Sequence, residues 1–148
     1  MAAHWRRLFG GVAERAEFEG TPGGWGENMG VYRRVWAMLD SWPVTGASST
    51  LIPLWMGVPV VSLAGAHAGQ RFGAAIMAGV GHKELAAKDA EGYVAQAVAL
   101  VRDRERLEDM RRSMRARVAA SPFLDAAGVA RDFEAAYRAL WRTRCLNP

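Results

Sequence analysis

The sequence predicts an α/β fold in which a parallel sheet carries helices on both faces. Three observations lead to this prediction. Short apolar, β-rich segments alternate with segments of helical periodicity, and turns rich in glycine and proline separate them. The hydrophobic fraction of 51% in 148 residues is sufficient for a packed core. A chain of this length suits one domain or one half of a larger two-lobed unit, and we assign residues 1–148 to a single domain.

The first part of the chain is predicted to be mostly helical. A helix over residues 2–13 carries three large apolar side chains inward: Trp5, Leu8 and Phe9. A short strand is predicted around Glu17–Phe18, and a glycine-rich loop covers Thr21–Asn28. The glycines of this loop lack the spacing of a dinucleotide-binding motif, so we interpret it as a flexible connection. A second helix is predicted over Glu27–Val35.

The middle of the chain contains the most informative alternation of elements. A buried strand is predicted over Trp36–Leu39, and Asp40 ends it. A helix follows over Ser48–Met56, and Gly57 stops it. A second buried strand is predicted over Val58–Leu63.

The remaining elements follow in the same pattern. They are a loop over Gly65–Gly69, a helix over Gln70–Ala78, a strand over Glu84–Ala87, a helix capped by Asp89, a helix broken by Ser121–Pro122, and a last helix over Asp125–Arg144. The predicted apolar faces of these four helices carry, in order, Phe72, Ala75 and Ile76; Val94, Ala97, Val98 and Val101; Leu107, Met110, Met114 and Val118; and Val129, Phe133, Tyr137, Leu140 and Trp141.

The stretch Trp42–Leu63 contains the best candidate for a binding site. Turn residues that include Gly46 lead into three hydroxyl residues, Ser48, Ser49 and Thr50, at the start of a helix. The amides and the dipole of a helix N-terminus favour an anion, and hydroxyls add donors, so this pattern indicates a phosphate site. It is neither a Walker loop nor a GxGxxG motif. The alternative interpretation is an ordinary capped junction between a loop and a helix.

Ligands of parallel sheets bind at the carboxyl ends of the strands. This rule predicts that three loops share one sheet edge, namely Asp40–Ser49, Ala64–Arg71 and Thr21–Asn28.

Several classes of protein are disfavoured by the composition. No apolar run is long enough to span a membrane, and the start MAAHWRRLF lacks the apolar core of a signal peptide, so we expect a cytoplasmic protein. The single Cys145 and three scattered histidines offer no metal-ligand spacing. The net charge of +4 comes mostly from arginine. In Arg102–Arg117 the arginines alternate with acidic residues, which favours a solvated helix face over a nucleic-acid surface.

The run YRRVWAMLDSWPVTGASSTLIPLWMGVPVVSLAG, from Tyr32 to Gly65, resembles the donor-binding segment of the bacterial-type O-linked N-acetylglucosamine transferase family. Three later segments, AGQRFGAAIM, HKELAAKDAEGYVAQAVALVRD and SPFLDAAGVARDFEAAYRALW, resemble the following segments of that family in the same order. The resemblance covers about residues 4–142.

This resemblance implies a Rossmann-like lobe, the C-terminal half of a GT-B glycosyltransferase, here without its first strands. The family is often fused to tetratricopeptide repeats. Such a lobe holds a UDP-sugar, UDP-N-acetylglucosamine, for inverting transfer to Ser or Thr hydroxyls of a protein acceptor, and no metal cofactor is expected. The resemblance places six residues at the UDP diphosphate: Gly46, Ala47, Ser48, Ser49, Thr50 and Arg71. It assigns no catalytic residue in this chain.

The sequence also departs from the family pattern. Ala47 and Asn28 stand where relatives often have histidine, and Ile52 replaces an acidic residue expected to bind ribose hydroxyls. Loss of a ribose partner is expected to cost about 1–3 kcal/mol of binding free energy. Two hypotheses therefore stay open: a UDP-sugar-binding lobe that is inactive without its N-terminal lobe, and a non-catalytic remnant or protein-interaction module. We expect that the last helix exposes Tyr137 and Trp141 unless that lobe or a second copy covers them.

Overall fold

The computed structural model describes residues 2–17 and 23–146. Contacts divide the chain into two compact units, residues 1–31 and 32–148. The predicted single domain over residues 1–148 stays a prediction.

The described residues of unit 1 include three short helices. These are α1 (Ala2–Phe9), the 3-10 helix η1 (Gly10–Arg15) and α2 (Trp25–Val31). Gly10 has a φ of +53° where α1 passes into η1, a conformation that glycine adopts without steric cost. The predicted inward direction of Leu8 and Phe9 is wrong, since their side chains are 60% and 47% exposed. A short amphipathic helix needs an apolar partner face, and Ala13 is the one buried residue described in this unit.

Two predictions for this region lie partly outside the described residues. Phe18 of the predicted strand and residues 21 and 22 of the predicted glycine-rich loop belong to the part that is not described. The chain is helical from Trp25, so α2 starts before the predicted Glu27 and ends before the predicted Val35. The predicted place of this loop at the sheet edge stays a prediction.

Unit 2 is built on a parallel sheet of three strands in the order β1-β2-β3. The strands are β1 (Met38–Leu39), β2 (Val60–Leu63) and β3 (Ala86–Ala87). Met38 pairs with Val60, and Ser62 pairs with Ala86. β2 is buried, but β1 is an outer strand of the described sheet, and Leu39 is 56% exposed. The prediction that the strand over Trp36–Leu39 is buried is therefore wrong.

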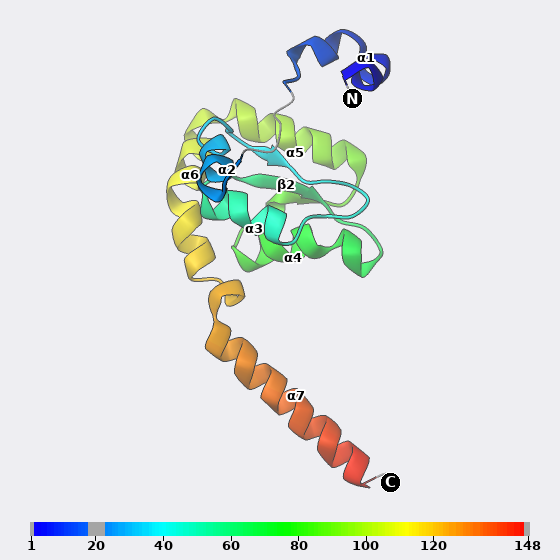
Figure 1. Ribbon diagram of the computed structural model, residues 1–148, viewed down its shortest axis with the longest axis vertical. Helices are drawn as coiled ribbons and strands as arrows, with labels where there is room; N and C mark the ends of the chain where they lie inside the picture. Colours follow the sequence, from blue (N-terminus) through cyan, green and yellow to red (C-terminus); the bar gives the residue numbers. More distant parts are fainter. Residues whose placement is uncertain (1, 18–22, 147–148) are drawn as a thin grey trace. The chain divides into compact units, whose positions relative to one another are not determined.

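Helices cover both faces of this sheet, which confirms the predicted α/β fold. In Figure 1, α3 (Ser48–Trp55) and α4 (Phe72–Gly79) lie on one face, and α5 (Ala90–Arg102) lies on the other. α6 (Arg104–Ala119) packs against α3 and α5. Because α3 and α4 are the crossovers of successive parallel strand pairs, connections of the usual right-handed sense put both on the same face.

The core lies between the sheet and these helices. Its fully buried side chains include Leu54, Val60, Val61, Met77, Leu100 and Met114. The four residues predicted as the apolar face of α6, Leu107, Met110, Met114 and Val118, are all buried.

The predicted faces of α4 and α5 need correction. α4 buries Gly73, Ile76 and Met77 and leaves Phe72 and Ala75 exposed. α5 buries Leu100 and partly buries Tyr93 and Ala97, whereas Val94, Val98 and Val101 are exposed. Small apolar residues occur all around both helices, so periodicity alone does not select the buried face.

Three 3-10 helices and one long helix complete unit 2. The 3-10 helices are η2 (Ala68–Gln70), η3 (Lys83–Leu85) and η4 (Pro122–Leu124), and the long helix is α7 (Ala126–Leu146). None of the described α7 residues is buried, and Tyr137 and Trp141 are 68% and 71% exposed. No helix in the described ranges is long and apolar enough to cross a membrane.

Candidate functional site

Two of the three predicted loops meet at the carboxyl ends of β1 and β2. The amide and the hydroxyl of Thr45 both donate to the carbonyl oxygen of Gly69, at 3.1 and 3.2 Å. In addition, a Cβ placed on Gly65 would lie 2.6 Å from the Trp42 ring, so the backbone of the second loop packs directly on this indole. The predicted proximity of the Asp40–Ser49 and Ala64–Arg71 loops is confirmed.

The N-terminus of α3 presents unused donors at this edge. Ala47 is the N-cap residue and has no side-chain cap, while the amides of Thr50 and Leu51 bond to its carbonyl oxygen. Among the described residues, the amides of Ala47, Ser48 and Ser49 have no acceptor. All three residues are exposed. A helix start with free amides carries partial positive charge and is suited to an anion.

The buried carboxylate of Asp40 organises the loop before this helix. Its Oδ1 accepts hydrogen bonds from the amides of Ser41 and Gly46 at 3.0 and 2.9 Å and from the Thr50 hydroxyl at 3.4 Å. Its Oδ2 accepts from the Ser62 hydroxyl at 2.8 Å. One side chain thus ties β1, β2 and the first turn of α3 together.

Two glycines allow this close packing. A Cβ on Gly46 would lie 3.2 Å from Asp40 Oδ1 and 2.5 Å from Thr50 Oγ1. A Cβ on Gly73 would collide with Ser62 and with the other Asp40 oxygen. The Gly73 amide donates to Thr45 Oγ1 at 3.2 Å, which links the start of α4 to the same loop. Neither position has room for a side chain, which explains why both residues are glycine.

Tyr93 supports the carboxyl end of β1 from the other face of the sheet. Its hydroxyl donates to the main-chain oxygen of Asp40 at 2.9 Å. Burial raises the pKa of Tyr93, and the negative charge of Asp40 raises it further. The phenol therefore remains protonated and able to donate at neutral pH.

The six predicted site residues fall into distinct environments. Ala47, Ser48 and Ser49 lie at the open helix start, whereas the Gly46 amide is directed to Asp40. Thr50 is fully buried, and its hydroxyl is also directed to Asp40. Arg71 is exposed immediately before α4 and forms no ion pair with any described residue.

Sequence reasoning missed four residues that support this site. They are Asp40, Thr45, Ser62 and Tyr93. The position of Asp40 directly after a strand was a usable signal, since polar residues there face the ligand edge of a parallel sheet. No pattern along the chain joins Asp40 to Ser62 or Tyr93.

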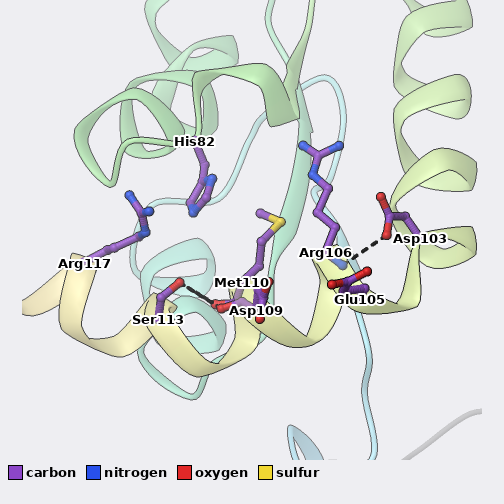
Figure 2. A pocket seen from close by; sticks show the side chains of 8 residues that line it. All are labelled: His82, Asp103, Glu105, Arg106, Asp109, Met110, Ser113 and Arg117. Atoms are coloured by element: carbon purple, nitrogen blue, oxygen red, sulfur yellow. Dashed lines mark hydrogen bonds between the residues drawn. The ribbon is translucent and has the colours of Figure 1, made fainter.

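A hollow of about 380 Å³ lies between α6 and the segment before β3. Figure 2 shows His82 and Arg117 at one end of it and Asp103, Glu105 and Arg106 at the other. His82 and η3 precede β3, so this hollow belongs to the opposite sheet edge from the α3 N-terminus. Its mixture of charges is less suited to a diphosphate than the helix start.

A short chain of polar contacts lies beside this hollow. His82 Nδ1 is 3.0 Å from Glu84 Oε1, which is 3.4 Å from Arg106 Nη2. Burial alone would raise the pKa of Glu84, but the hydrogen bond from His82, a backbone hydrogen bond and the two neighbouring charges lower it overall. His82 Nε2 is buried without a hydrogen-bond partner among the described residues. In residues 2–17 and 23–146, no three His, Cys, Asp or Glu side chains gather as metal ligands.

Comparisons with known proteins point to one family. The family model of glycosyl transferase family 41 matches residues 35–133 of this chain. SPINDLY of Oryza sativa subsp. japonica, named a probable UDP-N-acetylglucosamine–peptide N-acetylglucosaminyltransferase, is 35% identical over 119 residues. SPINDLY of Hordeum vulgare is 34% identical over the same length. Each match covers 80% of this chain and 13% of the relative.

A solved structure agrees with these matches. An O-GlcNAc transferase mutant of Thermobaculum terrenum has a TM-score of 0.88 and 30% sequence identity. The match covers 98% of this chain and 28% of that one. This chain therefore spans a small part of the length of its relatives.

Proposed function

The chain belongs to glycosyl transferase family 41, and we propose that it binds the diphosphate of a UDP-sugar, UDP-N-acetylglucosamine, for transfer to Ser or Thr hydroxyls of proteins. The family resemblance found in the sequence is confirmed by the comparisons. Donor binding and acceptor class are our proposals, because the chain covers 13% of the relatives that carry the name of this activity.

The observation that carries this proposal is the open N-terminus of α3. Three consecutive amides, from Ala47 to Ser49, have no acceptor among the described residues and lie at the carboxyl edge of the sheet. The hydroxyls of Ser48 and Ser49 add donors at the same place. A diphosphate supplies several anionic oxygens, which match this set of donors and the positive end of the helix dipole.

The chemical role of this site is stabilisation of the leaving group. When the bond from the sugar to UDP breaks, negative charge grows on the diphosphate. Amides fixed at the helix start stabilise that charge without a metal ion, and the Arg71 guanidinium adds positive charge from the neighbouring loop. Thr50 acts indirectly in this proposal, because its hydroxyl is engaged by Asp40.

In this role the chain binds the donor, and transfer takes place in a larger assembly. An N-terminal lobe closes over the donor and brings the acceptor hydroxyl, since a reacting pair must be held in a defined geometry. The half-buried Ile52 supplies no carboxylate for a ribose hydroxyl, so the diphosphate provides most of the donor affinity.

Calorimetric titration of UDP and UDP-N-acetylglucosamine into the purified chain tests this function. Ser48→Asp is the informative variant, because a carboxylate near a helix N-terminus stabilises the helix by about 0.3–1 kcal/mol yet repels a phosphate. Ser48→Asn is the matched control, with a similar shape and no charge. We expect saturable binding in the wild-type protein and in Ser48→Asn, and loss of binding in Ser48→Asp with no loss of stability.

Two outcomes would contradict the proposal. Equal UDP affinity in Ser48→Asp and the wild-type protein would place the nucleotide elsewhere. A folded wild-type protein that shows no saturation at millimolar UDP would favour the alternative, a non-catalytic remnant or interaction module.

A further inference from the structure

We propose that Asp40 is the positioning residue of the donor site, which holds the amides of Ala47 to Ser49 in the orientation that receives the diphosphate. This inference rests on the proposed function and assigns a role to a residue that touches no ligand itself. The Asp40 side chain is buried, and the four donors around it come from its own loop, from α3 and from β2.

The geometry connects Asp40 to both ends of the helix start. A single oxygen, Oδ1, accepts from the Gly46 amide just before the N-cap and from the Thr50 hydroxyl in the first turn. The N-cap and the first two helical residues lie between these two anchors. Because both anchors bind one atom, the backbone from 46 to 50 is held in place, and the amides of residues 47–49 remain at the exposed helix start without an acceptor among the described residues.

The surroundings prevent Asp40 from moving. Ser62, which binds the other carboxylate oxygen, is fully buried, and Gly73 packs so tightly that a Cβ there would collide with that oxygen. The Tyr93 hydroxyl fixes the main-chain oxygen of Asp40 from the opposite face of the sheet. Contacts from β2, α3, α4 and α5 therefore hold this residue in one position, which is the requirement for a preorganised site.

The negative charge of Asp40 limits the ways in which this residue can assist a phosphate site. A carboxylate behind a phosphate site repels the ligand, so its contribution must come from its capacity to accept hydrogen bonds. Asp40→Asn keeps Oδ1 as an acceptor for Gly46 and presents an amide to Ser62, whose hydroxyl can also accept. Asp40→Ala removes every acceptor and leaves the Gly46 amide without a partner.

Nuclear magnetic resonance titrations with UDP and with uridine test this role. A positioning residue changes the contribution of the diphosphate, whereas a residue needed only for folding changes both affinities. We expect Asp40→Ala to weaken UDP about tenfold and to leave uridine unchanged, and Asp40→Asn to restore UDP binding. Asp103→Ala is the control, because Asp103 accepts a backbone amide at the start of α6 and lines the hollow at the opposite sheet edge.

A milder variant covers the case in which Asp40→Ala does not fold. Thr50→Val keeps the side-chain volume and removes one of the two anchors on Oδ1. We expect it to weaken UDP about threefold with uridine unchanged.

Backbone relaxation measurements on the ligand-free protein separate this inference from the proposed function. We expect the amides of residues 47–49 to lose order in Asp40→Ala or Thr50→Val and to keep it in Asp40→Asn. If the wild-type protein fails to bind UDP while these amides still lose order, the proposed function is overturned and the positioning role stands. If these amides keep their order in the variants, or if UDP binds with an unchanged preference over uridine, the positioning role is overturned.

Discussion

Replacement of Gly46 by alanine tests how the donor loop is built. Gly46 has no positive φ, so alanine can adopt its backbone conformation and the effect comes from side-chain room alone. The new Cβ would lie 2.5 Å from Thr50 Oγ1, 3.2 Å from Asp40 Oδ1 and closer still to the Ser49 hydroxyl. The exposed Ser49 can rotate away, but the fully buried Thr50 cannot move without losing its hydrogen bond.

These contacts set the expected magnitude. Overpacking of a well-packed site costs about 1–3 kcal/mol of unfolding free energy. Loss of one hydrogen bond adds about 0.5–1.5 kcal/mol. We therefore expect Gly46→Ala to lower the unfolding free energy by about 1.5–4.5 kcal/mol. UDP affinity should fall about tenfold, because the amides after Gly46 shift with the displaced turn.

Urea unfolding followed by tryptophan fluorescence measures the stability change, and calorimetry measures UDP binding. Gly69→Ala is the matched control in the neighbouring loop, because a Cβ on Gly69 meets nothing within 4 Å. We expect Gly69→Ala to behave as the wild-type protein in both assays. Equal stability and equal UDP affinity for the two variants would refute the assignment of Gly46 to a tightly packed turn.

Three further predictions concern the core and two titrating groups. Met114→Ala truncates a fully buried side chain and should lower the unfolding free energy by about 2–5 kcal/mol in urea unfolding, whereas Leu140→Ala on exposed α7 should change it by less than about 0.5 kcal/mol. The pKa of Glu84 is lowered in the folded state, so its stabilising contribution is present above the unfolded pKa of about 4.3 and disappears as the pH falls through the folded value. Acid unfolding of Glu84→Gln should thus depend less on pH in that range, and an unchanged acid limb would contradict the assignment. The pKa of Tyr93 is raised, so its contribution is present below about pH 10 and is lost as the pH rises through the folded value. Tyr93→Phe should therefore lower the unfolding free energy at pH 8 by about 0.5–1.5 kcal/mol, measured by urea unfolding, because the hydrogen bond to Asp40 is lost. Its stability should also depend less on pH in the alkaline range. An alkaline pH dependence identical to that of the wild-type protein would rule this out.

The extent to which sequence predicts this fold varies from helix to helix. The buried face of α6 was predicted correctly because its four large apolar residues contrast with arginine, aspartate and glutamate on the other sides. The buried faces of α4 and α5 were not predicted correctly. Small apolar residues such as alanine occur on all sides of both helices, so the sequence contrasts the buried side only weakly with the exposed ones. The position of β1 at an outer place in the sheet was also missed, since strand order depends on contacts between distant segments.

The candidate site shows the same division. The order of residues in 42–63 was enough to predict a helix start with hydroxyls after a glycine-containing turn, and resemblance to the family indicated the ligand. The sequence did not predict the direction in which each donor group points. Ser48 and Ser49 stay exposed, but Thr50, the next residue, turns inward to Asp40, because one helical residue advances the side chain by about 100°.

The α/β class, the family and the local chemistry of the loop before α3 therefore follow from the amino-acid sequence, because these depend on residue types and short spacings. Which groups remain free for a ligand depends instead on the folded structure. Asp40 gathers donors from positions 6, 10 and 22 residues along the chain, and Tyr93 reaches it from 53 residues away. Such convergence arises when strands and helices pack, since buried polar groups must find partners wherever the fold brings them. The amides of residues 47–49 stay available because the fold satisfies their neighbours and leaves this helix start at the open edge of the sheet.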